Sequence, residues 1–290
     1  MKYSYIFNEN IDMFKCPVCE DSMYLDESKS IICRNNHCFD ISRSGYVNLL
    51  LNSVKIQYDK KMFESRKVIC NMGFFDPLIK SIILLIDNFI SGTKSNKIKV
   101  LDAGCGEGFH LSRIIGGIHK KEDVNYQGVG IDISKEGIQT ASKNYKGIIW
   151  CVADLARIPF KDKQFDIILN ILSPSNYGEF NRITGNEGIL IKVVPGSDYL
   201  KELRKAFYQE KSAEVYSNNG VVEHFGRNLK IIHTCNLIYS VEVSKEEMKH
   251  LIKMTPLSWR AADEKVQKVI NQGIDLVTAD FTIMAGKMKL

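Results

Sequence analysis

The stretch Lys99-Val-Leu-Asp-Ala-Gly-Cys-Gly-Glu-Gly108 indicates the architecture of the chain, because it joins a short apolar strand to a helix through a glycine-rich turn. Glycine lets a backbone approach a ligand closely. The turn is neither the phosphate loop G-x-x-x-x-G-K-[ST], since no lysine follows, nor the dinucleotide pattern G-x-G-x-x-G. Glu107 would repel a pyrophosphate, so a ligand with an ammonium and a sulfonium group fits the turn better.

Apolar segments alternate with helical patterns around this turn. The expected strands are Lys97–Asp102, Gln127–Asp132, Ile148–Val152, Phe165–Leu169, Gly188–Val193, Lys230–Ser244 and Val277–Ala285. One helix is expected from about His110. Three others are expected over Lys135–Asn144, Lys245–Met254 and Asp263–Gln272. Strands that alternate with helices predict βαβ units, and therefore an α/β, Rossmann-like fold with a mostly parallel sheet and helices on both faces.

Acidic residues end the strands that follow the glycine turn. Asp132 ends the second strand, where a carboxylate accepts hydrogen bonds from ribose hydroxyls. Asp154 follows the third strand, where it can meet an adenine amino group. The expected cofactor-binding residues are Asp102, Gly104, Gly106, Gly108, Asp132 and Asp154. In this order they resemble the class I S-adenosylmethionine methyltransferases; a nicotinamide-binding domain is the alternative.

Cysteine pairs near the N-terminus have the spacing of a zinc site. Cys16-Pro-Val-Cys19 is followed, after thirteen residues, by Cys33 and then by His37-Cys38. Two such pairs can close a tetrahedral, structural zinc site, which a unit of about 50 residues needs because its own core is small. Either His37 or Cys38 completes the site, and His37 is preferred. The alternatives are free thiols or a redox pair.

Composition limits the remaining possibilities. The 290 residues carry a net charge of +5, which permits a nucleic-acid partner without requiring one. Eight cysteines with no secretory signal before them indicate a reducing cytoplasm. The longest apolar stretch, Pro77–Ile90, contains Lys80 and Asp87 and is too short to span a bilayer, so no membrane is expected. We expect a zinc-binding module at 1–53, a helical linker region at 54–96 and the cofactor-binding domain at 97–290.

The chain as a whole resembles the RlmA-type bacterial 23S rRNA (guanine-N1-)-methyltransferases nearly end to end. The motifs that carry the resemblance are Cys16-x-x-Cys19…Cys33…His37-x-Phe39-Asp40, Gly45–Leu50, Asp59…Met62…Arg66-Lys67…Gly73…Pro77-Leu78, Leu101–Gly108, Asp132–Lys135, Ile158–Phe160, Leu200-Lys-Glu202-Leu203…Tyr208 and Met254–Arg260. The last two are absent from generic methyltransferases. The segment Ser173–Asn176 departs from the family pattern, at the place where the target base is expected.

The resemblance implies methylation of guanine N1 in hairpin 35 of 23S ribosomal RNA, with S-adenosylmethionine and Zn²⁺ as cofactors. It also implies that residues 1–53 recognise RNA and that the protein is a homodimer. A small-molecule methyltransferase and a non-catalytic zinc scaffold are the alternative functions.

Guanine N1 carries a proton at neutral pH that must leave as the methyl group arrives. The candidate proton acceptors are Glu179, Asp154 and Asp198, although Asp154 also fits a cofactor contact and Asp198 a helix cap. Trp259 and Arg260 suit a base and a phosphate together, and Arg66 belongs to a basic stretch that can contact RNA. Phe109 and Tyr177 are further candidates for stacking on a base, with core packing as the alternative.

Overall fold

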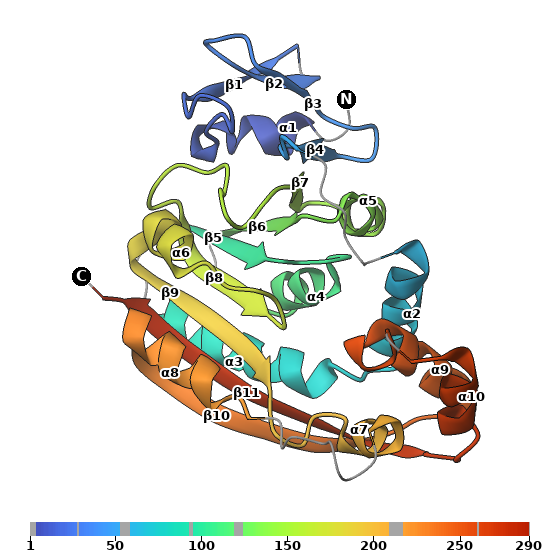
Figure 1. Ribbon diagram of the computed structural model, residues 1–290. Helices are drawn as coiled ribbons and strands as arrows, with labels where there is room; N and C mark the ends of the chain where they lie inside the picture. The colour runs from blue at the N-terminus through green and yellow to red at the C-terminus, as the bar shows by residue number, and fades with distance from the viewer. Residues whose placement is uncertain are drawn as a thin grey trace.

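The computed structural model describes residues 4–27, 29–52, 59–92, 95–118, 124–208, 217–259 and 261–289. A large sheet runs through most of them (Figure 1). Its strands are β4 (Tyr46–Asn48), β5 (Lys97–Ala103), β6 (Asn125–Asp132), β7 (Ile149–Val152), β8 (Phe165–Ile171), β9 (Thr184–Pro195), β10 (Leu229–Glu242) and β11 (Leu276–Met288).

The order of these strands is β10-β11-β9-β8-β5-β6-β7-β4. Neighbouring strands from β4 to β9 run parallel, whereas β11 runs antiparallel to both β9 and β10. The chain changes direction across the sheet between β5 and β8, and ligands of open α/β sheets bind beside such a switch point. The prediction of a mostly parallel α/β sheet is confirmed.

Side-chain caps fix the start of some of the helices. The helices after β4 are α2 (Lys60–Asn71), α3 (Asp76–Ser91), α4 (Phe109–Gly117), α5 (Lys135–Asn144), α6 (Tyr177–Ile183), α7 (Lys201–Phe207), α8 (Asn219–Asn228), α9 (Lys245–Met254) and α10 (Asp263–Ile270). Those with a side-chain cap are α2, α5, α6 and α9. Ser134 caps α5 by accepting the N–H of Gly137, and Ser244 with Glu247 forms a capping box at α9. Such caps stabilise a helix by about 1 kcal/mol each.

Both faces of the sheet are buried except along the edge strand β10, where side chains are exposed. Successive strand residues point to opposite faces, so Val100 joins one core cluster and Leu101 the other. The first cluster contains the apolar sides of α3, α4 and α9, and the second contains α6 and the N-terminal segment. Helices therefore cover one face, and the N-terminal segment takes part of the place of a helix layer on the other.

The N-terminal segment packs directly on this second face. It contains α1 (Ser4–Asn8), the 3₁₀ helix η1 (Ile11–Met13) and a small antiparallel sheet of β1 (Met23–Asp26), β2 (Ser30–Cys33) and β3 (Cys38–Asp40). The rings of Phe14 and Phe160 meet edge to face with centroids 5.2 Å apart. β4 then extends the large sheet beside β7, so the segment 1–53 and the main domain share strands as well as core.

The helical segment between β10 and β11 folds back over α2. It consists of α9, the 3₁₀ helix η2 (Pro256–Ser258) and α10, and α9 packs along α2. His250 on α9 meets the hydroxyl of Ser65 on α2 at 3.2 Å. This packing brings the Met254–Trp259 segment to the carboxyl ends of the parallel strands.

In the part of the chain that the structure describes, no single helix is long and apolar enough to cross a membrane. Helices α2 and α3 are together long and apolar enough, but neither is alone, and the chain bends by 76° between them. The apolar side of α3 is buried in the core of the sheet domain through Leu78, Ile82 and Ile86.

Candidate functional site

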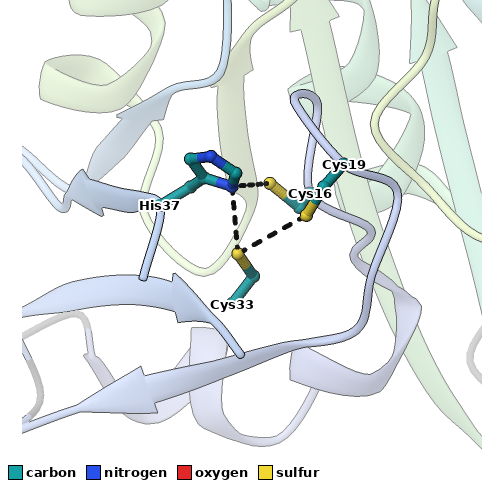
Figure 2. A group of neighbouring side chains, drawn as sticks. All are labelled: Cys16, Cys19, Cys33 and His37. Atoms are coloured by element: carbon teal, nitrogen blue, oxygen red, sulfur yellow. Dashed lines mark hydrogen bonds between the residues drawn. The ribbon is translucent and has the colours of Figure 1, made fainter. Parts of the chain in front are cut away.

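Four side chains of the N-terminal segment converge on one point: Cys16, Cys19, Cys33 and His37 (Figure 2). Their ligand atoms all lie within 4.8 Å of one another. The Sγ atoms of Cys19 and Cys33 are 3.7 Å apart, and Nδ1 of His37 lies 3.5 Å from Sγ of Cys16 and 3.3 Å from Sγ of Cys33. Cys38 is exposed on β3 and lies outside this group.

These separations suit tetrahedral zinc. Zn–S bonds of about 2.3 Å and Zn–N bonds of about 2.0 Å place tetrahedral ligands about 3.8 Å apart for two sulfurs and about 3.5 Å apart for sulfur and nitrogen. The hydrogen bond between Asn35 and Cys19 lowers the pKa of that thiol to about 6, whereas burial raises the pKa of the Cys16 thiol to about 11. A bound metal would deprotonate both thiols, since a coordinating thiol loses its proton to the metal's charge. With four protein ligands, the site has no open position and is structural.

The glycine turn between β5 and α4 depends on left-handed backbone and on close approach. Gly104 and Gly108 have φ of +86° and +81°. A Cβ atom on Gly104 would lie 2.6 Å from Cβ of Ser173, and one on Gly108 would lie 2.4 Å from the ring of Trp150. Both positions therefore exclude other residues, and the turn is held against the segment that follows β8.

Asp132 fastens this turn from the end of β6. Its carboxylate accepts the N–H of Gly106 at 2.8 Å through one oxygen and the N–H of Ser134 at 2.8 Å through the other. A carboxylate has room for about four hydrogen bonds, so both oxygens can still accept from a ligand hydroxyl. Asp154 follows β7, and one of its oxygens accepts the N–H of Ala156.

A buried ion pair supports the other side of the turn. Nε of Arg66 on α2 lies 3.1 Å from Oε1 of Glu107, at an ion-pair distance but without hydrogen-bond geometry. Arg66 Nη2 also meets Nδ1 of His110 at 3.4 Å. Burial raises the pKa of Glu107 and lowers that of His110, so the imidazole is neutral. Below the turn, Asp102 is buried with an oxygen that has no partner among the described residues, and burial raises its pKa to about 8.

The glycine turn, Asp132 and Arg66 all line one cavity of about 1040 Å³. Four of the expected cofactor residues line it, namely Gly104, Gly106, Asp132 and Asp154. Asp102 and Gly108 are not among the described residues that line it. The opposite wall comes from the segment that follows β8, from β9 and from the Met254–Trp259 segment. The volume is at the upper end of the range of small-molecule sites, which leaves room for a cofactor together with part of a second ligand.

A polar cluster lies at this wall of the cavity, where Asn170 near the end of β8 pairs with Lys192 of β9. Nζ of Lys192 donates to Oδ1 of Asn170 at 2.6 Å and to Oγ of Ser175 at 2.6 Å. Asn170 Nδ2 also donates to Ser173 Oγ at 2.6 Å. Lys192 is only 4% exposed, and burial lowers the pKa of its amine to about 8.

Two of the three candidate proton acceptors are held by ion pairs with neighbouring basic side chains. Glu179 is paired with Arg182 at 2.8 Å, accepts the N–H of Ile158, and is not among the described residues that line the cavity. Asp198 does not cap α7, whose N-cap is Leu200; it pairs with Lys201 instead. The expected cap was wrong because the chain turns through a left-handed residue, Leu200, before the helix begins.

The residues expected to contact RNA do not share one location in the structure. Trp259 lines the cavity and is 38% exposed, so its ring reaches solvent at the rim. Arg66 lies inside the cavity wall beside Gly106 and not on the open surface of α2. Phe109 is buried in the core, whereas Tyr177 lines the cavity. Arg260 lies outside the described residues.

The cavity also contains residues that the sequence patterns did not single out. Lys192, Phe75 and Tyr199 all line it. Lys192 carried a usable signal, because a single lysine interrupts the apolar run Gly188–Val194. Phe75 and Tyr199 carried none, since aromatic residues next to apolar helices are ordinary core residues.

Two family models match the chain. The model described as "Methyltransferase domain" matches residues 94–285, and the model described as "RlmA, N-terminal" matches residues 14–55. The first contains the glycine turn and the whole cavity wall formed by the sheet, and the second contains all four members of the zinc-type cluster.

Three curated relatives match over most of their length. "Putative 23S rRNA (guanine-N(1)-)-methyltransferase YxjB" of Bacillus subtilis is 43% identical over 96% of this chain and 98% of its own. "23S rRNA (guanine(748)-N(1))-methyltransferase" of Streptomyces fradiae is 26% identical over 92% and 94%. A Micromonospora griseorubida relative, "Putative 23S rRNA (guanine-N(1)-)-methyltransferase", is 24% identical over 84% and 86%. With both modules matched and this identity across nearly the whole chain, the protein belongs to the RlmA family of S-adenosylmethionine-dependent, zinc-ribbon methyltransferases.

Proposed function

We propose that the protein methylates N1 of a guanine in hairpin 35 of 23S ribosomal RNA. The observation that carries the proposal is the single cavity, in which the glycine turn and the polar cluster around Lys192 face the same space. A methyl donor held by the turn and a base held at the cluster would then be neighbours. The names of the relatives supply the RNA and the atom.

The cofactor end of the cavity fits S-adenosylmethionine, which supplies an electrophilic methyl group on sulfonium. Asp132 would accept hydrogen bonds from the ribose hydroxyls, and Asp154 would meet the adenine amino group. The guanidinium of Arg66 lies beside Gly106 and would hold the carboxylate of the methionine part. We therefore assign Arg66 to the cofactor and not to RNA.

The RNA end of the cavity is its rim. Sequence-specific recognition of RNA favours unpaired bases that can be turned out and stacked on an aromatic ring. Trp259 offers such a ring at the rim, and Arg260 follows it in the chain. Residues 1–53 would hold the stem by shape, since their zinc site is structural. Much of the rate would come from aligning the donor with N1.

The same proposal includes a cytoplasmic homodimer. β10 is the outermost strand of the sheet, is fourteen residues long and pairs only with β11 among the described strands. Ile231, Ile232 and Ile238 on it are exposed. A long apolar edge strand invites pairing with another strand, and a second copy of the chain offers the same edge. Light scattering of the purified protein would measure this directly.

Primer extension on 23S RNA tests the function. Methylation at N1 blocks Watson–Crick pairing and stops reverse transcriptase, so RNA from cells with the gene should give a stop in hairpin 35 that is lost on its deletion. The purified protein with S-adenosylmethionine should restore the stop on unmodified RNA. If neither stop appears, the RNA assignment fails and the small-molecule alternative takes its place.

A further inference from the structure

We propose that Lys192 is a catalytic residue whose ammonium group donates a hydrogen bond to guanine O6 and stabilises the negative charge that forms as N1 loses its proton. The inference rests on the proposed function, since it names the residue that makes guanine N1 nucleophilic.

The contacts of Lys192 are those of a protonated amine. Its three acceptors are Oδ1 of Asn170 at 2.6 Å, Oγ of Ser175 at 2.6 Å and the carbonyl oxygen of Ser173 at 3.4 Å. Ser175 Oγ gives its own proton to Asn170 Oδ1, so it can only accept from the lysine. An ammonium group has three donors and no acceptor, and it matches this set.

The third contact is the weak one. At 3.4 Å it lies at the limit of a hydrogen bond, whereas the other two are short. One N–H of Lys192 can therefore turn from the carbonyl oxygen of Ser173 to a substrate oxygen at little cost. The two short bonds keep the nitrogen in place meanwhile.

Lys192 is a buried cation without a counter-charge. No ion pair involves it among the described residues, and burial is the one resolved cause of its lowered pKa. The other titratable residues that line the cavity are Arg66, Asp132, Asp154, Tyr177, Tyr199, Arg204 and His224. A buried charge is unfavourable unless it is paired. A ligand that brings negative charge to the site would therefore be stabilised strongly by Lys192.

The position of Lys192 suits this role. A Cβ atom on Gly104 of the cofactor turn would touch Ser173, and the carbonyl of Ser173 is the weak acceptor of Lys192. The polar cluster and the cofactor turn are thus adjacent. In guanine, N1 is bonded to C6, the carbon that carries O6. A guanine whose O6 accepts from Lys192 would therefore present N1 toward the methyl donor.

The reaction balances without a change in the protonation of Lys192. N1 gives its proton to a water molecule in the cavity, and the charge left behind is shared between N1 and O6. The electron pair on N1 forms the bond to the methyl carbon, while the carbon–sulfur bond breaks and its pair stays on sulfur, which becomes neutral.

A neutral Lys192 that takes the N1 proton would give the opposite pH dependence, because the deprotonated amine would be the active form and the rate would rise through about pH 8. Arginine also separates the two roles, since its pKa stays above 12 and it cannot act as a base. Lys192→Arg keeps the cation, Lys192→Met removes it, and Lys99→Met is the matched control. Lys99 also has a pKa lowered by burial, but it lies at the opposite end of the parallel strands, bonded to Gln164.

The experiment measures kcat and KM for transfer of tritiated methyl to a 23S RNA transcript from pH 6 to 10, with cofactor affinity by calorimetry. Removing one donor to a developing oxyanion costs about 10²–10³-fold in kcat. We expect a loss of this order for Lys192→Met with unchanged cofactor affinity, at least tenfold recovery in Lys192→Arg, and wild-type kcat for Lys99→Met. The wild-type rate should decline above about pH 8 as Lys192 deprotonates, and Lys192→Arg should lack this decline.

Asn170→Asp provides a second, nearly isosteric test. It places a carboxylate against the ammonium of Lys192, so kcat should fall and the high-pH decline should move to higher pH. Wild-type kcat in Lys192→Met or in Asn170→Asp would overturn the inference, as would a folded, cofactor-binding Lys192→Arg that is as inactive as Lys192→Met. A wild-type enzyme that leaves the 23S transcript unmethylated refutes the proposed function instead.

Discussion

Nε of Arg66 lies 3.1 Å from Oε1 of Glu107, so an ion pair ties helix α2 to the glycine turn of the cofactor site. The side chain of Glu107 is 3% exposed, whereas that of Arg66 is 23% exposed through the cavity. The two partners therefore differ in what remains when the other is removed. Loss of Arg66 leaves a buried carboxylate, but loss of Glu107 leaves a cation that still reaches the cavity.

This asymmetry predicts unequal effects on stability. Arg66→Met should lower the free energy of unfolding by about 3 kcal/mol, as expected when one partner of a buried pair is lost. Glu107→Gln should cost less than Arg66→Met. Chemical denaturation of both single variants and of the double variant measures the coupling. Equal losses in the two single variants, with additive effects in the double, would contradict the pairing.

Asp102 predicts a pH-dependent stability. Burial raises its pKa from 3.8 to about 8. The folded state then binds more protons than the unfolded state between about pH 4 and pH 8, so this residue's contribution to stability falls as pH rises through that window. Asp102→Asn removes the titrating group and keeps the shape. Its stability relative to the wild type should rise from pH 5 to pH 8.5 in thermal unfolding; a constant difference would rule out the raised pKa.

Most of the secondary structure followed from local sequence signals. Helices α5 and α9 have the predicted bounds because a serine caps each start and an apolar stripe repeats along each helix. β9 begins at Thr184, four residues earlier than predicted. The early part, which contains Gly185 and Gly188, is paired with β8 across an irregular register, and such pairing is not visible in a local pattern.

The remaining features could not be predicted from local sequence, because they depend on long-range contacts. β4 has three residues, too few to carry a periodic pattern, and it exists because β7 offers an unpaired edge. The glycine turn, Asp132 and the four zinc-type ligands could be predicted, since each follows from residue type and spacing. Lys192 could not be assigned a role, because its meaning depends on Asn170 and Ser175 on neighbouring segments.

Asp132→Ala should weaken binding of S-adenosylmethionine. A hydrogen bond to a charged group is worth about 1.5–3 kcal/mol, which corresponds to roughly 10- to 150-fold in Kd. The change also frees the N–H of Gly106, which loosens the turn in the same direction. Calorimetry measures the affinity, with Asp263→Ala on α10 as the control acidic residue outside the cavity. Unchanged affinity would place the cofactor elsewhere.

The zinc ligands can be separated from their neighbours by single substitutions. Cys33→Ser and His37→Ala should each reduce bound zinc more than tenfold and destabilise the N-terminal segment, because metal binding and folding are coupled. Cys38→Ser is the matched control, since Cys38 follows His37 but is exposed and outside the cluster. Metal analysis of the purified variants decides the matter. Loss of zinc in Cys38→Ser with retention in His37→Ala would favour the four-cysteine site.

Trp259 should act on RNA and not on the cofactor. Its ring is exposed at the rim of the cavity, on the segment that α9 holds against α2. Stacking of a base on an aromatic ring contributes about 1–3 kcal/mol. Trp259→Ala should therefore raise the KM for 23S RNA by roughly 5- to 150-fold, while Trp259→Phe retains most of the affinity.

Steady-state kinetics with varied RNA, together with calorimetry of S-adenosylmethionine, distinguishes the possible roles of this ring. Cofactor affinity should stay within threefold of the wild type in both variants, because the residues expected to hold the cofactor lie on the turn side of the cavity, at Gly104, Asp132 and Asp154. If Trp259→Ala weakened the cofactor as much as the RNA, the ring would be supporting the whole cavity wall. If neither changed, the base would enter the cavity elsewhere, past Asn176 and His224, where a second hollow adjoins the first.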